Sequence, residues 1–173
     1  MTPREFASVL EFVSAQIAVI HCFAEPHFLD ALRAPEEAMV FRVAPNEVIS
    51  ILAQSDGPRV LGSLSAELER MDPHALVLDR SDTWAVLTLC GTDRANAFAR
   101  LCTTPLQYPP AFFQGAIGGV PAKAVIQKDW IHLMVSSVLG HHLRERILVG
   151  CGDLAPREIS WATFIVGAFK EMA

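Results

Sequence analysis

Residues 81–102 read SDTWAVLTLCGTDRANAFARLC, and this stretch contains the unit from which the rest of the fold is built. The run WAVLTLC is apolar and rich in strand-forming residues, Gly91 breaks it, and Thr92 and Asp93 are of the types that commonly begin helices. Apolar residues then recur at helical spacing, at Ala95, Phe98, Ala99 and Cys102. The stretch predicts a strand, a glycine turn and a helix with one buried face.

The same alternation extends through the chain. Strand-like runs flank Ser81-Asp82, the turn 44–46 and Lys128-Asp129, which predicts three hairpins. Apolar residues at helical spacing follow each hairpin, over 60–71, 95–102 and 138–147. Hairpins give antiparallel pairs and helices must cover a sheet face, so we expect an α+β fold with a mainly antiparallel sheet built from repeated β-α-β or hairpin-helix units.

The chain has 173 residues, which suits a single domain over 1–173. Residues 16–148 form its predicted core. The apolar spacing from Phe6 to Ile17 predicts a flanking helix over 1–15, and a second flanking helix is predicted within 151–173, beginning near Ile159. The segment from Thr103 to Gly119 is predicted to be a long loop.

The composition is apolar for a chain of this size, with 51% hydrophobic and 19% charged residues. The mean hydropathy is +0.32, and the excess predicts apolar surface buried against a partner. No apolar run approaches the roughly 20 residues of a membrane span. Arg4, Glu5 and Glu11 exclude a signal peptide, so a cytoplasmic location is expected. The net charge of -5, with no basic cluster, argues against a nucleic-acid partner.

The four cysteines are scattered and lack zinc-site spacing, so we predict buried free thiols and no metal site. Cys90 is the strongest candidate nucleophile, because a following helix N-terminus can activate a thiol. The alternative is that Cys90 ends the inward face of a strand while Thr92 or Asp93 caps the helix. The second interpretation is the prediction, so no catalytic residue is assigned.

Other polar candidates also have structural explanations. Gly118-Gly119 lacks a phosphate-loop motif and predicts a turn. Neighbours on a helix point about 100° apart, so His141-His142 alone cannot chelate a metal, and His142 is predicted on the apolar face. Asp79, Asp82 and Asp93 suit turns and helix caps, and the sequence does not indicate that they converge.

Three aromatic residues in the segment 103–119 are the candidate partner interface. Tyr108, Phe112 and Phe113 lie in a proline-rich stretch, and aromatic rings held on a stiff loop make good interface anchors. The alternative is that the loop folds its rings back onto its own core. Exposure of the rings distinguishes the two interpretations.

Two segments resemble the gamma subunit of heterotetrameric sarcosine oxidase. MVFRVAPNEVISIL is similar to that family's strand, A/G-P-D-E-W, strand signature, and HALVLDRSDTWAVLTLCGTDRANAFARLCTTPLQ is similar to its V-D-x-S-D, L-x-L-S-G-P-D-A-R and C-P-L-D-L segment. An aromatic and proline-rich loop and Val120-Pro121 follow in the family's order. The resemblance covers Gln16 to Leu148. Departures are Val48 in place of Trp, Thr92 in place of Pro, and TPLQ over 104–107.

The resemblance implies a fold like the folate-binding domain of the glycine cleavage aminomethyltransferase. It also implies an accessory, non-catalytic subunit of an oxidoreductase complex that demethylates sarcosine or another N-methyl amino acid and passes the one-carbon unit to tetrahydrofolate. Flavins, NAD and folate are then expected on larger subunits and none on this chain, with the alpha chain as the chief partner. The alternatives are a stand-alone folate-binding or one-carbon transfer protein, which would bind tetrahydrofolate itself, and a homo-oligomer.

Overall fold

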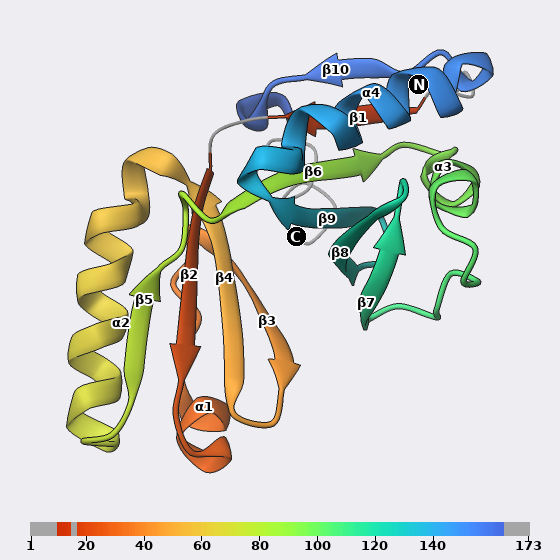
Figure 1. The fold of residues 1–173 in the computed structure, drawn as a ribbon. Coiled ribbons are helices and arrows are strands. Elements are labelled where there is room, and N and C mark those ends of the chain that lie inside the picture. Colours follow the sequence, from red (N-terminus) through yellow and green to blue (C-terminus); the bar gives the residue numbers. More distant parts are fainter. Residues whose placement is uncertain (1–9, 15–16, 165–173) are drawn as a thin grey trace, which may run out of the picture. The chain divides into compact units, whose positions relative to one another are not determined.

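The computed structural model describes residues 10–14 and 17–164 of the chain (Figure 1). The chain divides into two compact units. Residues 16–84 form one, named here the four-stranded unit, and residues 1–15 with 85–173 form the other, the six-stranded unit. That the whole chain folds as one domain stays a prediction.

The four-stranded unit is a split β-α-β arrangement. Its sheet has the order β3-β4-β2-β5, and every pair in it is antiparallel. Its elements are β2 (Ile17–Phe23), α1 (Pro26–Ala31), β3 (Ala38–Ala44), β4 (Glu47–Ala53), the short 3-10 turn η1 (Gln54–Asp56), α2 (Gly57–Met71) and β5 (Leu76–Asp79). The first and third strands therefore lie at the centre of the sheet, and the second and fourth lie at its edges.

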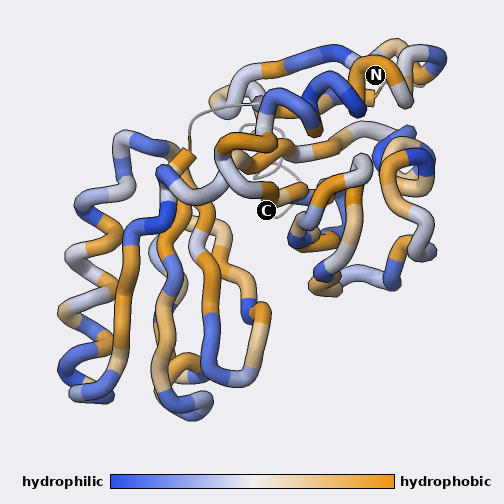
Figure 2. The backbone as a smooth tube through the Cα atoms, in the orientation of Figure 1, coloured by the Kyte–Doolittle hydropathy of each residue, from blue (hydrophilic) through white to orange (hydrophobic). Residues whose placement is uncertain are grey.

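Helix α2 covers one face of this sheet. Its buried residues Val60, Leu64 and Leu68 recur at helical spacing and pack against Ala18, Ile20 and Cys22 of β2. The tube in Figure 2 shows the result, because hydrophobic and hydrophilic stretches alternate along α2. Val19, Ile49 and Ile51 lie on the opposite sheet face and are also buried, which explains why β2 and β4 read as continuous apolar runs.

The six-stranded unit has the sheet order β10-β1-β6-β9-β8-β7. The β1–β10 pair is parallel, and the β1–β6, β7–β8 and β8–β9 pairs are antiparallel. Its elements are β1 (Glu11–Ser14), β6 (Trp84–Cys90), α3 (Arg94–Leu101), β7 (Ala111–Ile117), β8 (Val120–Ile126), β9 (Trp130–Ser136), η2 (Ser137–Leu139), α4 (Gly140–Gly150), η3 (Gly152–Leu154) and β10 (Arg157–Ile159).

The second unit repeats the plan of the first with two additions. Strands β8, β9, β6 and β10 follow the order that β3, β4, β2 and β5 follow in the four-stranded unit, while β1 lies between β6 and β10 and β7 extends the sheet at the far edge. A glycine begins the covering helix in both units, directly after a 3-10 turn. A Cβ at Gly57 would lie 2.9 Å from Ala18 Cβ, and one at Gly140 would lie 2.6 Å from Ala85 Cβ. The start of α2 thus lies closely against β2, and the start of α4 lies closely against β6.

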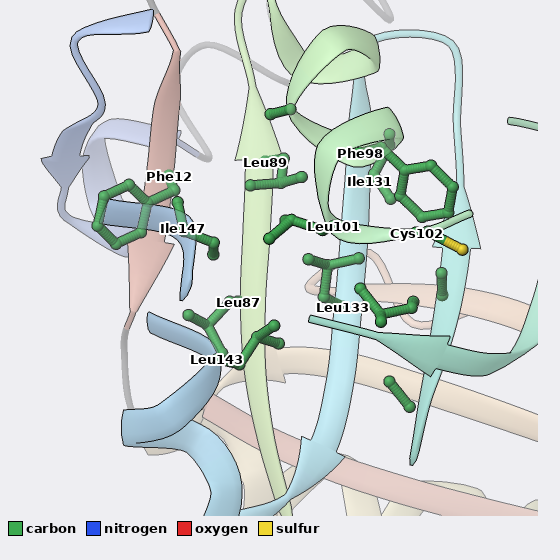
Figure 3. Packing of buried hydrophobic residues seen from close by; sticks show 14 of the residues in the cluster. Phe12, Leu87, Leu89, Phe98, Leu101, Cys102, Ile131, Leu133, Leu143 and Ile147 are labelled. Carbon is green, nitrogen blue, oxygen red and sulfur yellow. The ribbon is translucent and has the colours of Figure 1, made fainter. Parts of the chain in front are cut away.

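The core of the six-stranded unit lies between its sheet and helices α3 and α4 (Figure 3). Phe98 and Leu101 of α3 and Leu143 and Ile147 of α4 point toward the sheet, and all four are buried. The sheet contributes Phe12, Leu87, Leu89, Ile131 and Leu133 to the same cluster. Alternate residues along β6 and β9 therefore supply one continuous apolar layer.

The α+β class, the antiparallel pairing and the hairpins at 44–46 and at Lys128-Asp129 are confirmed. The hairpin predicted at Ser81-Asp82 is wrong, and the expected single sheet is two sheets. A turn does form there, with Thr83 N donating to Arg80 O at 2.9 Å, but β5 pairs with β2 whereas β6 pairs with β1. Local turn chemistry specifies a reversal of the chain and does not specify which strand becomes the partner.

The predicted helix over 1–15 is wrong where the structure describes it. Residues 11–14 form β1, which pairs with β6 on one side and β10 on the other. Phe12 and Val13 are both buried because the strand is covered on both faces, which produces an apolar pattern resembling helical spacing. Residues 1–9 of that prediction lie outside the described residues.

The other two predictions about irregular or terminal segments need partial correction. Within 151–173, residues 152–154 form the 3-10 turn η3 and residues 157–159 form β10. Of the predicted helix, the structure describes residues 161–164 as α-helical. Residues 165–173 of the predicted helix lie outside the described part. The long loop predicted over 103–119 ends at Pro110, because residues 111–117 form β7 and Gly118-Gly119 forms the β7–β8 turn, with φ of 61° and 85°.

Candidate functional site

The three aromatic residues predicted as a partner interface lie in different environments. Tyr108 is 93% exposed. Phe113 is half-buried and packs edge-on against Phe98, with ring centroids 6.3 Å apart and an interplanar angle of 84°. Phe112 is half-buried, and Lys123 Nζ lies 6.0 Å from its ring centre. Phe113 therefore belongs to the core, and Tyr108 presents the most accessible ring of the three.

The cysteines are buried free thiols, as predicted. Burial raises the pKa of the Cys90 thiol to about 12, and the neighbouring Glu11 carboxylate adds to the shift. Cys90 is the last residue of β6, and its Sγ lies 3.5 Å from Glu11 O. Burial also raises the pKa of Cys22 to about 12. A thiol with such a pKa is protonated at neutral pH, which opposes a nucleophilic role for Cys90.

The folded chain is therefore expected to resist thiol reagents. With pKa values near 12, the thiolate fractions of Cys22 and Cys90 at neutral pH are about a thousandfold below that of a free cysteine. An aromatic disulfide reagent should titrate all four thiols rapidly in denaturant and react with these two far more slowly without it. Rapid reaction at Cys90 in the folded chain, located by peptide mapping, would contradict this account.

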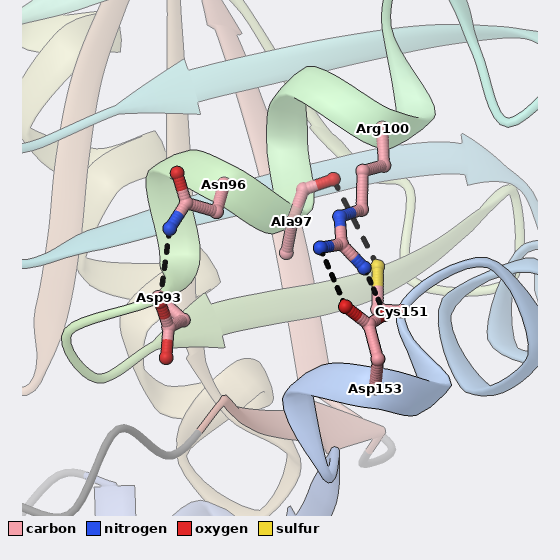
Figure 4. A network of polar contacts seen from close by, with 6 residues as sticks. All are labelled: Asp93, Asn96, Ala97, Arg100, Cys151 and Asp153. Carbon is pink, nitrogen blue, oxygen red and sulfur yellow. Dashed lines mark hydrogen bonds and ion pairs between the residues drawn. The ribbon is translucent and has the colours of Figure 1, made fainter.

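The carboxylates predicted as caps and turns have structural roles. Asp93 stands at the start of α3, where its backbone C=O accepts from Ala97 N at 2.9 Å. Its side chain accepts from Asn96 Nδ2 at 2.9 Å, so the expected side-chain cap of the helix backbone is replaced by a side-chain pair (Figure 4). Asp79 Oδ1 accepts from Ser81 N at 2.9 Å and from Ser81 Oγ at 2.6 Å. Asp82 is exposed in the same turn.

A second polar contact joins α3 to the segment after α4 (Figure 4). The Arg100 guanidinium donates to the Asp153 carboxylate through both terminal nitrogens, Nη1 to Oδ1 and Nη2 to Oδ2, the second at 2.8 Å. The hydrogen bond from Arg100 lowers the pKa of Asp153. Cys151 Sγ points back at Ala97 O, 3.9 Å away. These contacts fasten α3 and η3 together within the six-stranded unit, and they do not assemble an acid–base pair.

Two buried histidines form polar pairs that sequence reasoning missed. His132 Nδ1 lies 2.7 Å from Thr88 Oγ1, and burial lowers the pKa of His132 to about 3, so its ring is neutral at physiological pH. His21 Nδ1 lies 2.9 Å from Glu47 Oε1, and the ring stacks on Trp84 with centroids 6.2 Å apart. His21 lies in β2 and His132 lies in β9, each among apolar neighbours in the sequence. Their partners depend on strand register, for which the sequence carries no local signal.

The other histidines and carboxylates form no metal site in the part of the chain that the structure describes. No group of three or more His, Cys, Asp and Glu side chains within residues 10–14 and 17–164 is arranged to hold a metal ion. The prediction for His142 is wrong, because Leu143 is buried and His142 is exposed, with Nε2 3.3 Å from Gly118 O. Within the same described residues, no helix combines the length and apolar character needed to cross a membrane.

The chain matches no protein-family model and no curated protein sequence. Its fold is similar to a chain of the heterotetrameric sarcosine oxidase from Corynebacterium sp. U-96, at 16% identity and a TM-score of 0.66, over 87% of this chain and 86% of that one. It is also similar to the glycine cleavage system aminomethyltransferase T from Bartonella henselae, at 12% identity and a TM-score of 0.65, over 89% of this chain and 48% of that one.

A third similar structure is the aspartate kinase from Synechocystis, at 12% identity and a TM-score of 0.53, over 92% of this chain and 29% of that one. Proteins with different names and activities are thus similar to this chain in fold. At these identities the likenesses show the fold, and the chain is related in fold to sarcosine oxidase and aminomethyltransferase structures.

Proposed function

We propose that the chain is an accessory, non-catalytic subunit of a sarcosine-oxidase-like complex, with the larger alpha chain as its chief partner. The observation that carries the proposal is the match of nearly the whole chain to nearly a whole chain of a heterotetrameric oxidase. The aminomethyltransferase and aspartate kinase matches cover 48% and 29% of the longer chains. A fold of this size that serves as a separate chain in a multi-subunit oxidase suits an accessory subunit.

The environments of the described side chains support a non-catalytic role for this chain. The most suggestive nucleophile, Cys90, is buried with its pKa raised to about 12. Asp79 and Asp93 hold turns and a helix start, and His132 is buried as a neutral ring. Oxidative demethylation would then take place on partner subunits that carry the flavins, NAD and tetrahydrofolate. This chain would contribute assembly surface, in agreement with its apolar composition.

Tyr108 is the proposed anchor of the subunit interface. Its ring is 93% exposed on a segment that contains Pro105, Pro109 and Pro110, so little conformational entropy is lost when a partner covers it. Tyrosine is among the residues that dominate binding energy at the centres of interfaces.

Co-expression with a sarcosine-oxidase-type alpha chain tests the proposal. The two chains should elute together from gel filtration, and Tyr108→Ser should weaken the complex by about tenfold or more. The matched control is Val149→Ser, which removes a 75% exposed apolar side chain from α4 and should leave the affinity unchanged. Two separate peaks for the unmodified chains would exclude the accessory role.

The aminomethyltransferase likeness favours one second candidate, a stand-alone folate-binding or one-carbon transfer protein. Calorimetric titration of the isolated chain with a reduced folate separates the two. The accessory role predicts no saturable heat, because folate is expected on a partner subunit. Saturable binding with micromolar affinity would replace the accessory role with the second candidate.

A further inference from the structure

The four sheet edges of the described residues differ in how they are protected against pairing. Strand β5 has four residues and ends in Asp79, and β10 has three residues, including Arg157 and Glu158. Strand β3 carries Arg42 and an irregular register next to it. Shortness, charge and irregularity are the devices by which proteins block edge-to-edge pairing. Strand β7 has none of them, since its seven residues AFFQGAI are uncharged and pair with β8 in unbroken register.

The hairpin geometry fixes which backbone groups of β7 point outward. Gly118 and Gly119 both have positive φ and form a two-residue turn, whose flanking pair, Ile117 and Val120, is a hydrogen-bonded pair. Hydrogen-bonded and non-hydrogen-bonded pairs alternate in an antiparallel ladder. The N–H and C=O groups of Phe112, Gln114 and Ala116 therefore point away from β8. Within the described residues β8 is the sheet neighbour of β7, and the far side of β7 is an edge.

The sequence of β7 is complementary to itself about Gln114. In an antiparallel pair of two copies centred there, Phe112 lies opposite Ala116, Phe113 opposite Gly115, and Ala111 opposite Ile117. Each pair joins a larger side chain to a smaller one, so the opposed side chains fit without collision. The Phe113 ring covers Gly115 of its own strand and does not obstruct the pairing. Gln114 lies opposite Gln114 of the second copy. The backbone N–H and C=O of Gln114 point away from β8, so the two residues can form a hydrogen-bonded pair. Pro110 and Gly118 limit the paired segment to these seven residues.

We propose that β7 pairs with β7 of a second copy of this chain across a two-fold axis at Gln114, joining the two six-stranded sheets edge to edge. A two-fold interface requires one surface patch to be complementary to itself, which this strand satisfies. The absence of charge in β7 removes like-charge repulsion between the copies within the paired strands. The pairing does not rest on the proposed function, and it uses a strand edge that differs from the Tyr108 anchor.

Sedimentation of the full chain over about 1 to 100 µM tests the pairing, in the range of weak specific association. The mass should rise with concentration from 18.9 kDa toward twice that value. Gln114→Lys should raise the dissociation constant by about tenfold or more, because the two new ammonium groups face each other beside Lys123 of each copy. Gln114 is exposed, so the variant should remain folded. Gln54→Lys makes the same change at an exposed site in the four-stranded unit and should have no effect.

Ala116→Pro supplies an independent variant. It removes an outward N–H without removing a hydrogen bond to β8, so it should weaken the dimer by a similar factor while circular dichroism shows a folded chain. A monomer at every concentration would overturn the proposal. A dimer that survives both changes would overturn it as well. If Gln114→Lys instead weakens only a complex with an alpha chain, the edge binds a foreign strand and the self-pairing is refuted.

Discussion

Replacing Gly140 by valine is expected to lower the free energy of unfolding by about 3 kcal/mol, the upper part of the range for overpacking. A Cβ at this position would lie 2.6 Å from Ala85 Cβ, closer than real Cβ atoms approach one another. Ala85 Cβ is fixed to the backbone of β6 and cannot rotate away. The start of α4 must therefore move off the sheet, which would loosen the packing of Leu143 and Ile147 behind it.

The matched control lies at the other end of the same helix. Gly150 has no atom within 4 Å of its ideal Cβ position, so Gly150→Val should change the stability by less than about 1 kcal/mol. Urea unfolding of both variants gives the comparison. Equal losses would mean that the close approach of α4 to β6 does not determine the effect at Gly140, because valine has a higher helix propensity than glycine at both sites.

Replacing His132 by glutamine is expected to remove a large part of the acid sensitivity of the fold. The His132 pKa falls from its ordinary value of 6.5 to about 3 in the folded chain because the ring is buried. Below pH 6.5 the unfolded chain takes up a proton that the folded chain does not, so the folded state loses stability as the pH falls. Between pH 6.5 and 4.5 this one group should cost about 2 kcal/mol.

The free energy of unfolding should be measured against pH for both the variant and the parent. The difference between the slopes of the two curves gives the contribution of His132. Glutamine can keep a hydrogen bond to Thr88 Oγ1, and any loss of packing shifts the whole curve without changing its pH dependence. His141→Gln is the matched control, since His141 is exposed on α4 and its removal should leave the slope intact. Parallel curves for the parent and His132→Gln between pH 6.5 and 4.5 would contradict a buried neutral histidine.

The parts of the fold that were predicted correctly are those that local pattern determines. Helix α2 follows from the spacing of Val60, Leu64 and Leu68, and the strand-turn-helix over 84–101 follows from Gly91 and the residues around it. Strand pairing is not local. The turn at Ser81-Asp82 is predicted correctly. The two strands that flank it belong to different sheets, because β5 pairs with β2, which is distant from it in the sequence. Strand β1 was mistaken for a helix because burial on both faces erases the alternation that marks a strand.

The candidate site could likewise be predicted only where local sequence pattern determines it. Four scattered cysteines indicated buried thiols, and the structure confirms it. The pairing of Thr88 with His132 joins residues 44 positions apart, and that of His21 with Glu47 depends on the β2–β4 register. The exposure of Tyr108 and the burial of Phe113 could not be separated from sequence, because the boundary between loop and strand falls between them at Ala111.

Purification of the chain from its native source under mild conditions tests the central claim, that it serves as an accessory subunit of a sarcosine-oxidase-like complex. The account predicts elution with larger chains, together with the visible absorbance of bound flavin, and loss of that association in a strain that carries Tyr108→Ser. Elution of the chain without larger, flavin-carrying partners, at its own mass of 18.9 kDa or as a dimer of itself, would contradict the accessory role.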